Sequence, residues 1–275
     1  AALAAIADIL TERQAEWLAA NAEDVAGAKA AGMRSAMLAR RTLTTERVAG
    51  IVDGVRQVAA LPDPIGKVDK METRPNGLII GRRRVPLGGT AIIFEARPNV
   101  TVDAAALCLK SGNVCILRGG KEAIRSNRCV AELMRQALRS VGLPEDCISL
   151  VQDTSHETAN ELMHLDGYVD VLIPRGGAGL IRAVAKEASV PVIRTGEGVC
   201  HIYIDDEADL DMGARILFNA KCSRPSVCNA VECVLVHRDV AADFWKRALP
   251  LLDEKGVELR ADGEALEILG TRAVP

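Results

Sequence analysis

The chain has 275 residues, of which 49% are hydrophobic and 26% charged, a composition typical of a globular protein with a large core. The net charge of −3 and the 3% of aromatic residues argue against a basic or base-stacking surface for nucleic acid. No apolar stretch reaches the roughly 18 residues that span a membrane, so we expect neither nucleic acid nor a membrane as a partner.

Residues 1 to about 60 are predicted to be helical, because apolar residues recur there at helical spacing. Asn21 and Asp24 resemble a capping box that starts a second helix, and Gly32 is placed to end it. Thr44 is predicted to cap a further helix, which Pro62 stops. The apolar faces consist of Leu3, Ile6 and Leu10, continued by Trp17 and Leu18, and of Val48, Ile51, Val52, Val55 and Val58.

Residues 65–86 are predicted to form a long hairpin with polar faces. Asn76-Gly77 is the strongest short signal for a hairpin, and it is followed by an apolar run and by arginines at positions 82–84. We expect this hairpin to pair with the sheet edge of another subunit, and the protein to be a homo-oligomer, either a dimer or a tetramer. A solvated surface ribbon is the alternative that the sequence leaves open.

From Gly88 onward, short apolar segments rich in β-branched residues alternate with helical segments. Thr101 is predicted to cap a helix that ends at Gly112, and Thr154 with Glu157 forms a capping box for a later helix. The pattern predicts an α/β fold with a doubly wound parallel sheet, covered by helices on both faces. The expected strands span residues 91–94, 114–117, 148–151, 169–173, 190–193 and 201–204.

A second lobe is predicted after Asp205, with a helix at 210–219, a strand at 231–237 and a helix at 240–254. We place the boundary between the lobes near residue 205. The domains are therefore expected to be 1–204, which includes the hairpin, and 205–275.

Three glycine-rich turns follow predicted strands. A glycine turn that opens a helix lets backbone N–H groups approach a phosphate, and the helix dipole favours the anion. None of the turns matches a standard nucleotide-binding fingerprint, so tight-turn packing is an open alternative. Arg118 and Lys121 make the second turn the stronger candidate. The turns are Gly88-Gly89, Arg118-Gly119-Gly120-Lys121 and Arg175-Gly176-Gly177-Ala178-Gly179.

The segment from Glu95 to Val100 lies directly between a predicted strand and a predicted helix. Arg97 has the fork of N–H donors that binds a carboxylate or phosphate bidentately. Asn99 is a candidate donor to a developing oxyanion. The alternative is that Asn99 and Thr101 only cap the helix.

Eight cysteines lack the paired spacing of a metal site or a redox CxxC motif, so we expect reduced thiols, no metal and a cytoplasmic protein. Cys200, Cys222 and Cys228 are predicted on loops, whereas Cys108, Cys115, Cys129, Cys147 and Cys233 fall in or beside regular elements. His201 is a poor base for Cys200, since neighbours in a strand face opposite ways. Cys228 ranks first, with Lys221 and Arg224 nearby, although an inert packing thiol is the ordinary role of a cysteine.

Several motifs, taken in order, resemble the γ-glutamyl phosphate reductase family of the aldehyde dehydrogenase superfamily. The resemblance runs over essentially the whole chain and implies an aldehyde-dehydrogenase-like fold, with an NADP-binding domain at 1–204 and part of a catalytic domain at 205–275. The motifs are PLGGTAIIFEARPNVTVDAAALCLKSGN at 86–113, ILRGGKEA at 116–123, DVLIPRGGAGL at 170–180, GVCHIYID at 198–205 and RPSVCNAVE at 224–232.

The resemblance implies an enzyme that reduces L-glutamyl 5-phosphate to L-glutamate 5-semialdehyde with NADPH and releases phosphate, in the second step of proline biosynthesis from glutamate. Cys228 is implied as the nucleophile that forms a thioester. Asn99 is implied as the oxyanion donor, and we predict Arg97 and Arg224, from their chemistry and position, as substrate ligands. The cofactor residues implied are Arg118, Gly119, Gly120 and Lys121 at the adenosine ribose and its 2′-phosphate, with Gly176 and Gly177 at the pyrophosphate.

Two departures from the superfamily pattern concern the chemistry. Thr195 stands where hydrolytic aldehyde dehydrogenases carry a general-base glutamate, and Glu197 is displaced from that position. The absence of that base fits a thioester that reacts with hydride or phosphate rather than water. The family also continues beyond Pro275, and the chain begins within a helical pattern, so we expect a truncated chain with weak activity or none.

Two other functions remain open from the sequence. One is a non-catalytic fragment that binds a nucleotide or oligomerises, and the other is a related acyl-phosphate or aldehyde reductase with a different small-molecule substrate. A functional link to glutamate 5-kinase is also expected, because glutamyl phosphate is unstable.

Overall fold

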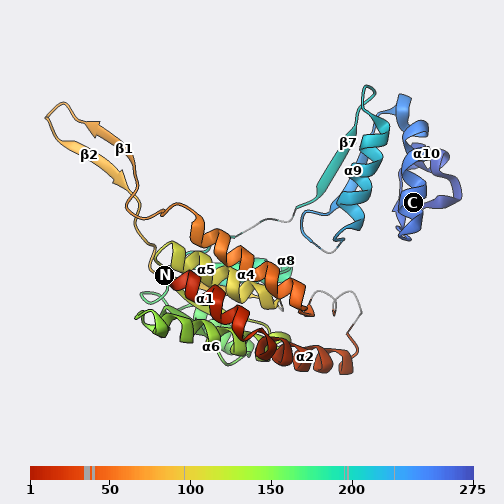
Figure 1. The fold of residues 1–275 in the computed structure, drawn as a ribbon. Helices are drawn as coiled ribbons and strands as arrows, with labels where there is room; N and C mark the ends of the chain where they lie inside the picture. The colour runs from red at the N-terminus through yellow and green to blue at the C-terminus, as the bar shows by residue number, and fades with distance from the viewer. Residues whose placement is uncertain (34–37, 39–40, 96, 195, 197, 226) are drawn as a thin grey trace. The chain divides into compact units, whose positions relative to one another are not determined.

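A computed structural model describes residues 1–33, 38, 41–95, 97–194, 196, 198–225 and 227–275 (Figure 1). The chain divides into two compact units, residues 1–195 and 196–275. The break lies earlier than the predicted boundary near residue 205. The reason is that the strand Cys200–Ile204, β7, pairs with β8, Val231–Val236, and so belongs to the second unit.

A parallel sheet forms the centre of the first unit. Its strand order is β5-β4-β3-β6 in the described part of the chain, and every neighbouring pair is parallel, as predicted. The strand expected at 190–193 is wrong, because only a single bridge joins Val192 to Leu172. The strands are β3 Gly89–Phe94, β4 Val114–Arg118, β5 Ile148–Leu150 and β6 Val171–Arg175.

Helices cover both faces of this sheet, which confirms the doubly wound prediction. Ile92 and Phe94 face one cluster of buried residues, whereas Ala91 and Ile93 face another, as the alternation of a strand requires. The first cluster involves α5 Pro98–Lys110 and α6 Ile124–Ser140, with α1 Ala2–Glu12, α2 Gln14–Ala30 and α4 Thr45–Ala60. The second involves α7 His156–Met163 and α8 Ala178–Glu187.

Helix α2 runs through the position where a capping box was predicted. Asn21 lies in the interior of α2, where its side chain accepts from Leu43 N–H at 2.7 Å and donates to the Ser126 hydroxyl at 3.1 Å. Asp24 accepts from Ser126 N–H at 2.8 Å, and so caps the start of α6 instead of its own helix. The two residues were misassigned because their partners are distant in sequence.

Of the other predicted helix caps, Thr44 is confirmed, whereas Thr101 and Thr154 are wrong. Thr44 accepts from Arg47 N–H and caps α4 as expected. Thr101 instead lies buried inside α5 and donates to Asn127 Oδ1 at 2.9 Å, since α5 begins at Pro98. Ser155, one residue after the predicted Thr154, caps α7.

The predicted hairpin is present as β1 Val68–Thr73 and β2 Ile79–Arg83, which pair antiparallel. Arg74 N–H donates to the Leu78 carbonyl at 2.8 Å, so the loop has three residues, and Gly77 at its end has φ +84°, which glycine adopts without strain. Every residue of both strands is exposed, including the apolar Met71 and Ile79. Figure 1 shows the hairpin as an arm that no other element of the first unit covers.

The second unit is built on the parallel pair β7 and β8, with α9 Leu210–Cys222 connecting them and α10 Arg238–Glu254 following. Its core lies around Phe244 and Trp245, whose ring centroids are 5.2 Å apart. Smaller elements complete the unit: β9 Leu259–Arg260, α11 Gly263–Leu269 and β10 Ala273–Val274. Among the described helices of the whole chain, none is long and apolar enough to cross a membrane.

The cap that Asp24 places on α6 predicts a stability effect. Asp24→Ala removes the acceptor of the buried Ser126 N–H and hydroxyl, so we expect the free energy of unfolding to fall by about 2 to 3 kcal/mol. Glu23→Ala is the matched control, because Glu23 forms only an exposed ion pair with Arg125 and its loss should cost less than about 0.5 kcal/mol. Urea unfolding of both variants measures the difference, and equal losses would contradict the cap.

Candidate functional site

The strand order reverses its direction between β3 and β6, which makes this position a topological switch point. From β3 the chain moves outward to β4 and β5, and it then returns to the other side of β3 to form β6. In doubly wound sheets, ligands bind outside the carboxyl ends of the strands at such a point. Glu95 and Arg97 follow β3, and Gly176 and Gly177 follow β6, so the structure brings these predicted residues to one edge of the sheet.

The turn from β6 to α8 holds an anionic group at the start of a helix. Gly177 is the N-cap of α8, and its N–H donates to Glu95 Oε1 at 3.1 Å. A Cβ at Gly176 would lie 2.8 Å from both Glu95 Cδ and Leu180 Cδ2, so a side chain there would displace Glu95 or Leu180. The helix start therefore accommodates negative charge, which suits a phosphate. Glu95 has no role in the sequence-based prediction, because only the fold brings it to Gly177.

The turn after β4 separates the two cations that were predicted to act together. Arg118 donates from Nη2 to the carbonyls of Thr154 at 2.7 Å and Ser155 at 2.8 Å, and burial lowers the pKa of its guanidinium. Arg118 thus anchors the turn after β5. Lys121 is exposed and forms no hydrogen bond or ion pair with the described residues, so its ammonium is available to a ligand.

The glycines of this turn let its backbone lie close to the helices that cover the sheet. Gly119 is buried, and a Cβ there would meet Asn127 Nδ2 and lie 3.2 Å from Phe94. Gly120 is the N-cap of the short helix Lys121–Ala123 and is partly exposed. Gly119 is therefore a packing residue, whereas Gly120 and Lys121 face outward.

Asn99 lies in the first turn of α5 and donates from Nδ2 to Asp103 Oδ2 at 2.9 Å. Burial raises the pKa of Asp103, while this hydrogen bond opposes the shift. One of the two amide N–H donors of Asn99 remains for another acceptor. The alternative that Asn99 and Thr101 cap α5 is wrong, because Arg97 occupies the N-cap position.

Cys228 lies in an exposed turn between α9 and β8. Its thiol forms no hydrogen bond with the described residues, while its carbonyl oxygen lies 3.7 Å from Cys200 Sγ. Lys221, predicted as a neighbouring cation, instead donates to the Val231 carbonyl at 3.0 Å. Arg224 is exposed, and although its carbonyl accepts from Val227 N–H at 3.3 Å, its guanidinium has no partner among the described residues.

All eight cysteines lie in the described part of the chain, and Cys228 is the exposed one. Cys200 begins β7 and Cys222 ends α9, so the prediction of loop positions for these two is wrong. The contact with Cys108, together with burial, raises the pKa of Cys115, which keeps that thiol protonated. Burial also raises the pKa of Cys222. Exposure therefore singles out Cys228 as the candidate nucleophile.

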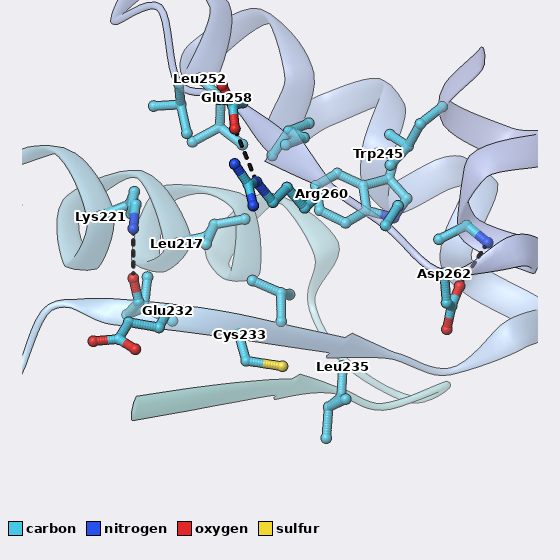
Figure 2. Close-up of a pocket in the computed structure, with 17 residues that line it drawn as sticks. Leu217, Lys221, Glu232, Cys233, Leu235, Trp245, Leu252, Glu258, Arg260 and Asp262 are labelled. Atoms are coloured by element: carbon cyan, nitrogen blue, oxygen red, sulfur yellow. Dashed lines mark hydrogen bonds and ion pairs between the residues drawn. The ribbon is translucent and has the colours of Figure 1, made fainter. Parts of the chain in front are cut away.

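The second unit contains a cavity of about 380 Å³ above β8. Cys233 and Leu235 of β8 and Arg260 are among its lining residues, and Figure 2 shows the Cys233 and Leu235 side chains on the side of β8 away from Arg260. Cys228 is not among the lining residues, so the cavity does not contain the candidate nucleophile. Thr195 and Glu197, which carry the prediction about the missing general base, lie outside the described residues.

Comparison with known proteins identifies the family. The model for the aldehyde dehydrogenase family matches residues 2–260. The chain belongs to this family. Within it, the chain is similar to proteins named γ-glutamyl phosphate reductase, which confirms the resemblance carried by its motifs.

The similarity to these relatives is high in sequence and in structure. The chain is 54% identical to the γ-glutamyl phosphate reductase of Carboxydothermus hydrogenoformans over 259 residues, which cover 94% of this chain and 62% of that protein. The crystal structure of the Thermotoga maritima enzyme matches with a TM-score of 0.89 at 39% identity, over all of this chain and 66% of that one. The Saccharomyces cerevisiae enzyme matches with a TM-score of 0.66 at 31% identity, over 98% of this chain and 68% of that one. The chain thus spans about three fifths of the curated relative.

The stability of the protein should depend on pH through Asp153, which lies in the turn that Arg118 anchors. Asp153 accepts from Ser155 N–H and from the hydroxyls of Ser155 and Thr158, which lowers the pKa of Asp153 to about 2. Its unfolded value is about 3.9, so its contribution to stability is complete above about pH 4 and is lost as pH falls toward 2. Asp153→Asn should therefore destabilise the protein most above pH 4, with the difference shrinking at lower pH.

Urea unfolding between pH 5 and pH 3 at constant ionic strength measures this difference. Asp8→Asn is the control, because Asp8 is exposed on α1 and has no hydrogen-bond partner among the described residues. A stability difference between wild type and Asp153→Asn that stays constant over this range would show that the hydrogen bonds do not stabilise the ionised form.

Proposed function

We propose that the protein reduces L-glutamyl 5-phosphate to L-glutamate 5-semialdehyde with release of phosphate, in proline biosynthesis from glutamate. The observation that carries the proposal is the match to proteins named γ-glutamyl phosphate reductase at more than 50% identity, with Cys228 as the exposed thiol among eight. An exposed thiol on a turn between regular elements is accessible to an acyl substrate.

Cys228 acts as the nucleophile in this proposal. Its thiolate attacks the acyl carbon of the substrate, phosphate leaves, and a thioester joins the glutamyl group to the enzyme. Thr195, at the position of the general base of hydrolytic relatives, cannot activate water as a carboxylate does, and this favours survival of the thioester until it is reduced.

Membership of the aldehyde dehydrogenase family implies a nicotinamide cofactor, which supplies the hydride when bound. Two features of the first unit fit such a group. The Gly177 N–H at the start of α8 already has an anion, the Glu95 carboxylate, as its acceptor. The free ammonium of Lys121 lies after β4 and suits a further phosphate, so we propose NADP(H) as the cofactor, with Lys121 at its 2′-phosphate.

The roles of Arg118 and the other cofactor candidates differ in this proposal. Arg118 positions the turn at Thr154 and Ser155 rather than contacting the nucleotide through Nη2. Gly119 packs against the helical layer, and Gly176 lies against Glu95 and Leu180. In this proposal Gly120, at the N-cap of the helix Lys121–Ala123, and Gly176 keep the backbone of the two turns free of side chains for the nucleotide.

Substrate recognition is proposed for two arginines and one amide. Arg224 is exposed four residues before Cys228 and suits the leaving phosphate. Arg97 at the N-cap of α5 suits a carboxylate of the substrate. Asn99 retains one N–H donor for the oxyanion of the tetrahedral intermediate.

A homo-oligomer and a cytoplasmic location complete the proposal. The β1–β2 hairpin exposes apolar side chains at 49% or more of their surface, among them Met71, Ile79 and Ile80, and pairing with a second subunit would bury them. Acyl phosphates hydrolyse readily in water, so a functional link to the kinase that makes the substrate follows from its chemistry.

Replacement of the nucleophile tests the reaction. Cys228→Ala should abolish phosphate-dependent reduction of NADP by glutamate semialdehyde, because no thioester can form. Cys129→Ala, in α6 of the first unit, is the control and should retain activity. Turnover that survives Cys228→Ala would refute the mechanism, and faster turnover of aspartate or acetylglutamate semialdehyde would refute the substrate.

Replacement of the free lysine tests the cofactor. Lys121→Ala should weaken NADPH binding about tenfold, or about 1.4 kcal/mol, and leave NADH binding nearly unchanged. Lys186→Ala is the control, because Lys186 is exposed in the last turn of α8. Fluorescence titration of both nucleotides measures the effect, and an equal loss for both would remove Lys121 from the 2′-phosphate.

A further inference from the structure

Cys200 and Cys228 lie side by side in the second unit. The parallel register pairs Cys200, the first residue of β7, with Val231, the first residue of β8, so the turn that precedes β8 lies next to the start of β7. Cys200 Sγ is 3.7 Å from the carbonyl oxygen of Cys228. A Cβ at Gly198 would also lie 3.5 Å from that oxygen, so the segment before β7 runs along the Cys228 backbone.

The backbone geometry limits the separation of the two residues. A carbonyl oxygen lies roughly 2.4 Å and a cysteine sulfur roughly 2.8 Å from its own Cα, so the Cα atoms of Cys200 and Cys228 lie at most about 9 Å apart. Disulfides join cysteines whose Cα atoms are about 4.4 to 6.8 Å apart. At that upper limit the exposed turn must move by about 2 Å before a disulfide can form.

The two thiols differ in accessibility. Cys228 is exposed, whereas Cys200 is partly buried at the start of its strand. An accessible thiol meets an oxidant first, and a partly shielded neighbour is then placed to react with the product. Within the described part of the chain, which includes all eight cysteines, Cys200 is the cysteine whose sulfur lies against Cys228.

We propose that Cys200 is a resolving thiol, which forms a reversible disulfide with Cys228 when a hydroperoxide oxidises Cys228. The disulfide itself depends only on the geometry of the second unit. Its consequence, a reversible loss of reductase activity that spares the nucleophile from permanent damage, rests on the proposed function.

The reaction has two steps. The Cys228 thiolate attacks one oxygen of hydrogen peroxide, the S–O bond forms as the O–O bond breaks, and the hydroxide released takes a proton. The sulfur loses two electrons and becomes a sulfenic acid, while the peroxide is reduced to water. The Cys200 thiol then gives its proton to solvent and attacks that sulfur, so that the S–S bond forms and the S–O oxygen leaves as a second water. A dithiol reductant returns both residues to thiols.

Peptide mapping tests the proposal. The protein is treated with hydrogen peroxide, alkylated with iodoacetamide, digested without reductant and analysed by mass spectrometry. We expect a peptide pair joined through Cys200 and Cys228 that disappears after dithiothreitol. In Cys200→Ser, we expect severalfold more sulfinic and sulfonic acid at Cys228, and less recovery of the Cys228 thiol on reduction.

Cys233→Ser, on the neighbouring strand, is the matched control and should form the same disulfide as wild type. Cys200→Ala is a second variant, and circular dichroism establishes that both Cys200 variants are folded. Over-oxidation of Cys228 at the same rate in wild type and in the Cys200 variants would overturn the proposal, as would a disulfide to another cysteine. A protein without reductase activity would still test the proposal, because the peptide mapping requires no turnover.

Discussion

The position of β3 in the middle of the parallel sheet is the constraint on which the first unit depends. Because β4 and β6 pair with opposite edges of β3, the chain must reverse its direction of travel across the sheet. This reversal places helices on both faces of the sheet. It also sends the connections that leave β3 and β6 in opposite directions, so neither covers the carboxyl ends of these strands. Glu95 and Gly177 can meet there for that reason, although 82 residues separate them.

The sequence predicted the sheet well, because its information is local. Each strand is a short run of β-branched apolar residues, and burial on both faces explains why the runs do not alternate with polar residues. The strand expected at 190–193 has the same composition but forms one bridge only. Composition alone cannot distinguish a paired strand from an extended segment that packs beside the sheet.

Caps were harder to predict, for a physical reason. Asn21 and Asp24 have the residue types and spacing of a local cap, but their acceptors and donors lie on another helix and on the segment before α4. A polar side chain at a buried position must find partners wherever the fold provides them. Arg118 shows the same effect at the candidate site. Its position beside Lys121 suggested a shared ligand, yet the carbonyls of Thr154 and Ser155 bind it.

The eight thiols differ in exposure, and exposure decides which of them a substrate or an oxidant can reach. The contact with Cys108 and burial raise the pKa of Cys115, and burial raises the pKa of Cys222, whereas a thiol must ionise to react readily with acyl groups or with oxidants. The exposure of Cys228, on which its proposed reaction with an acyl phosphate depends, would also admit a peroxide, since both reactions need the same thiolate and the same open approach. A thiol beside an exposed nucleophile therefore has a chemical role that a buried thiol elsewhere lacks. The register of β7 and β8 places Cys200 beside the backbone of Cys228, so the strand pairing that builds the second unit also determines which thiol would react with an oxidised Cys228 in the proposed scheme.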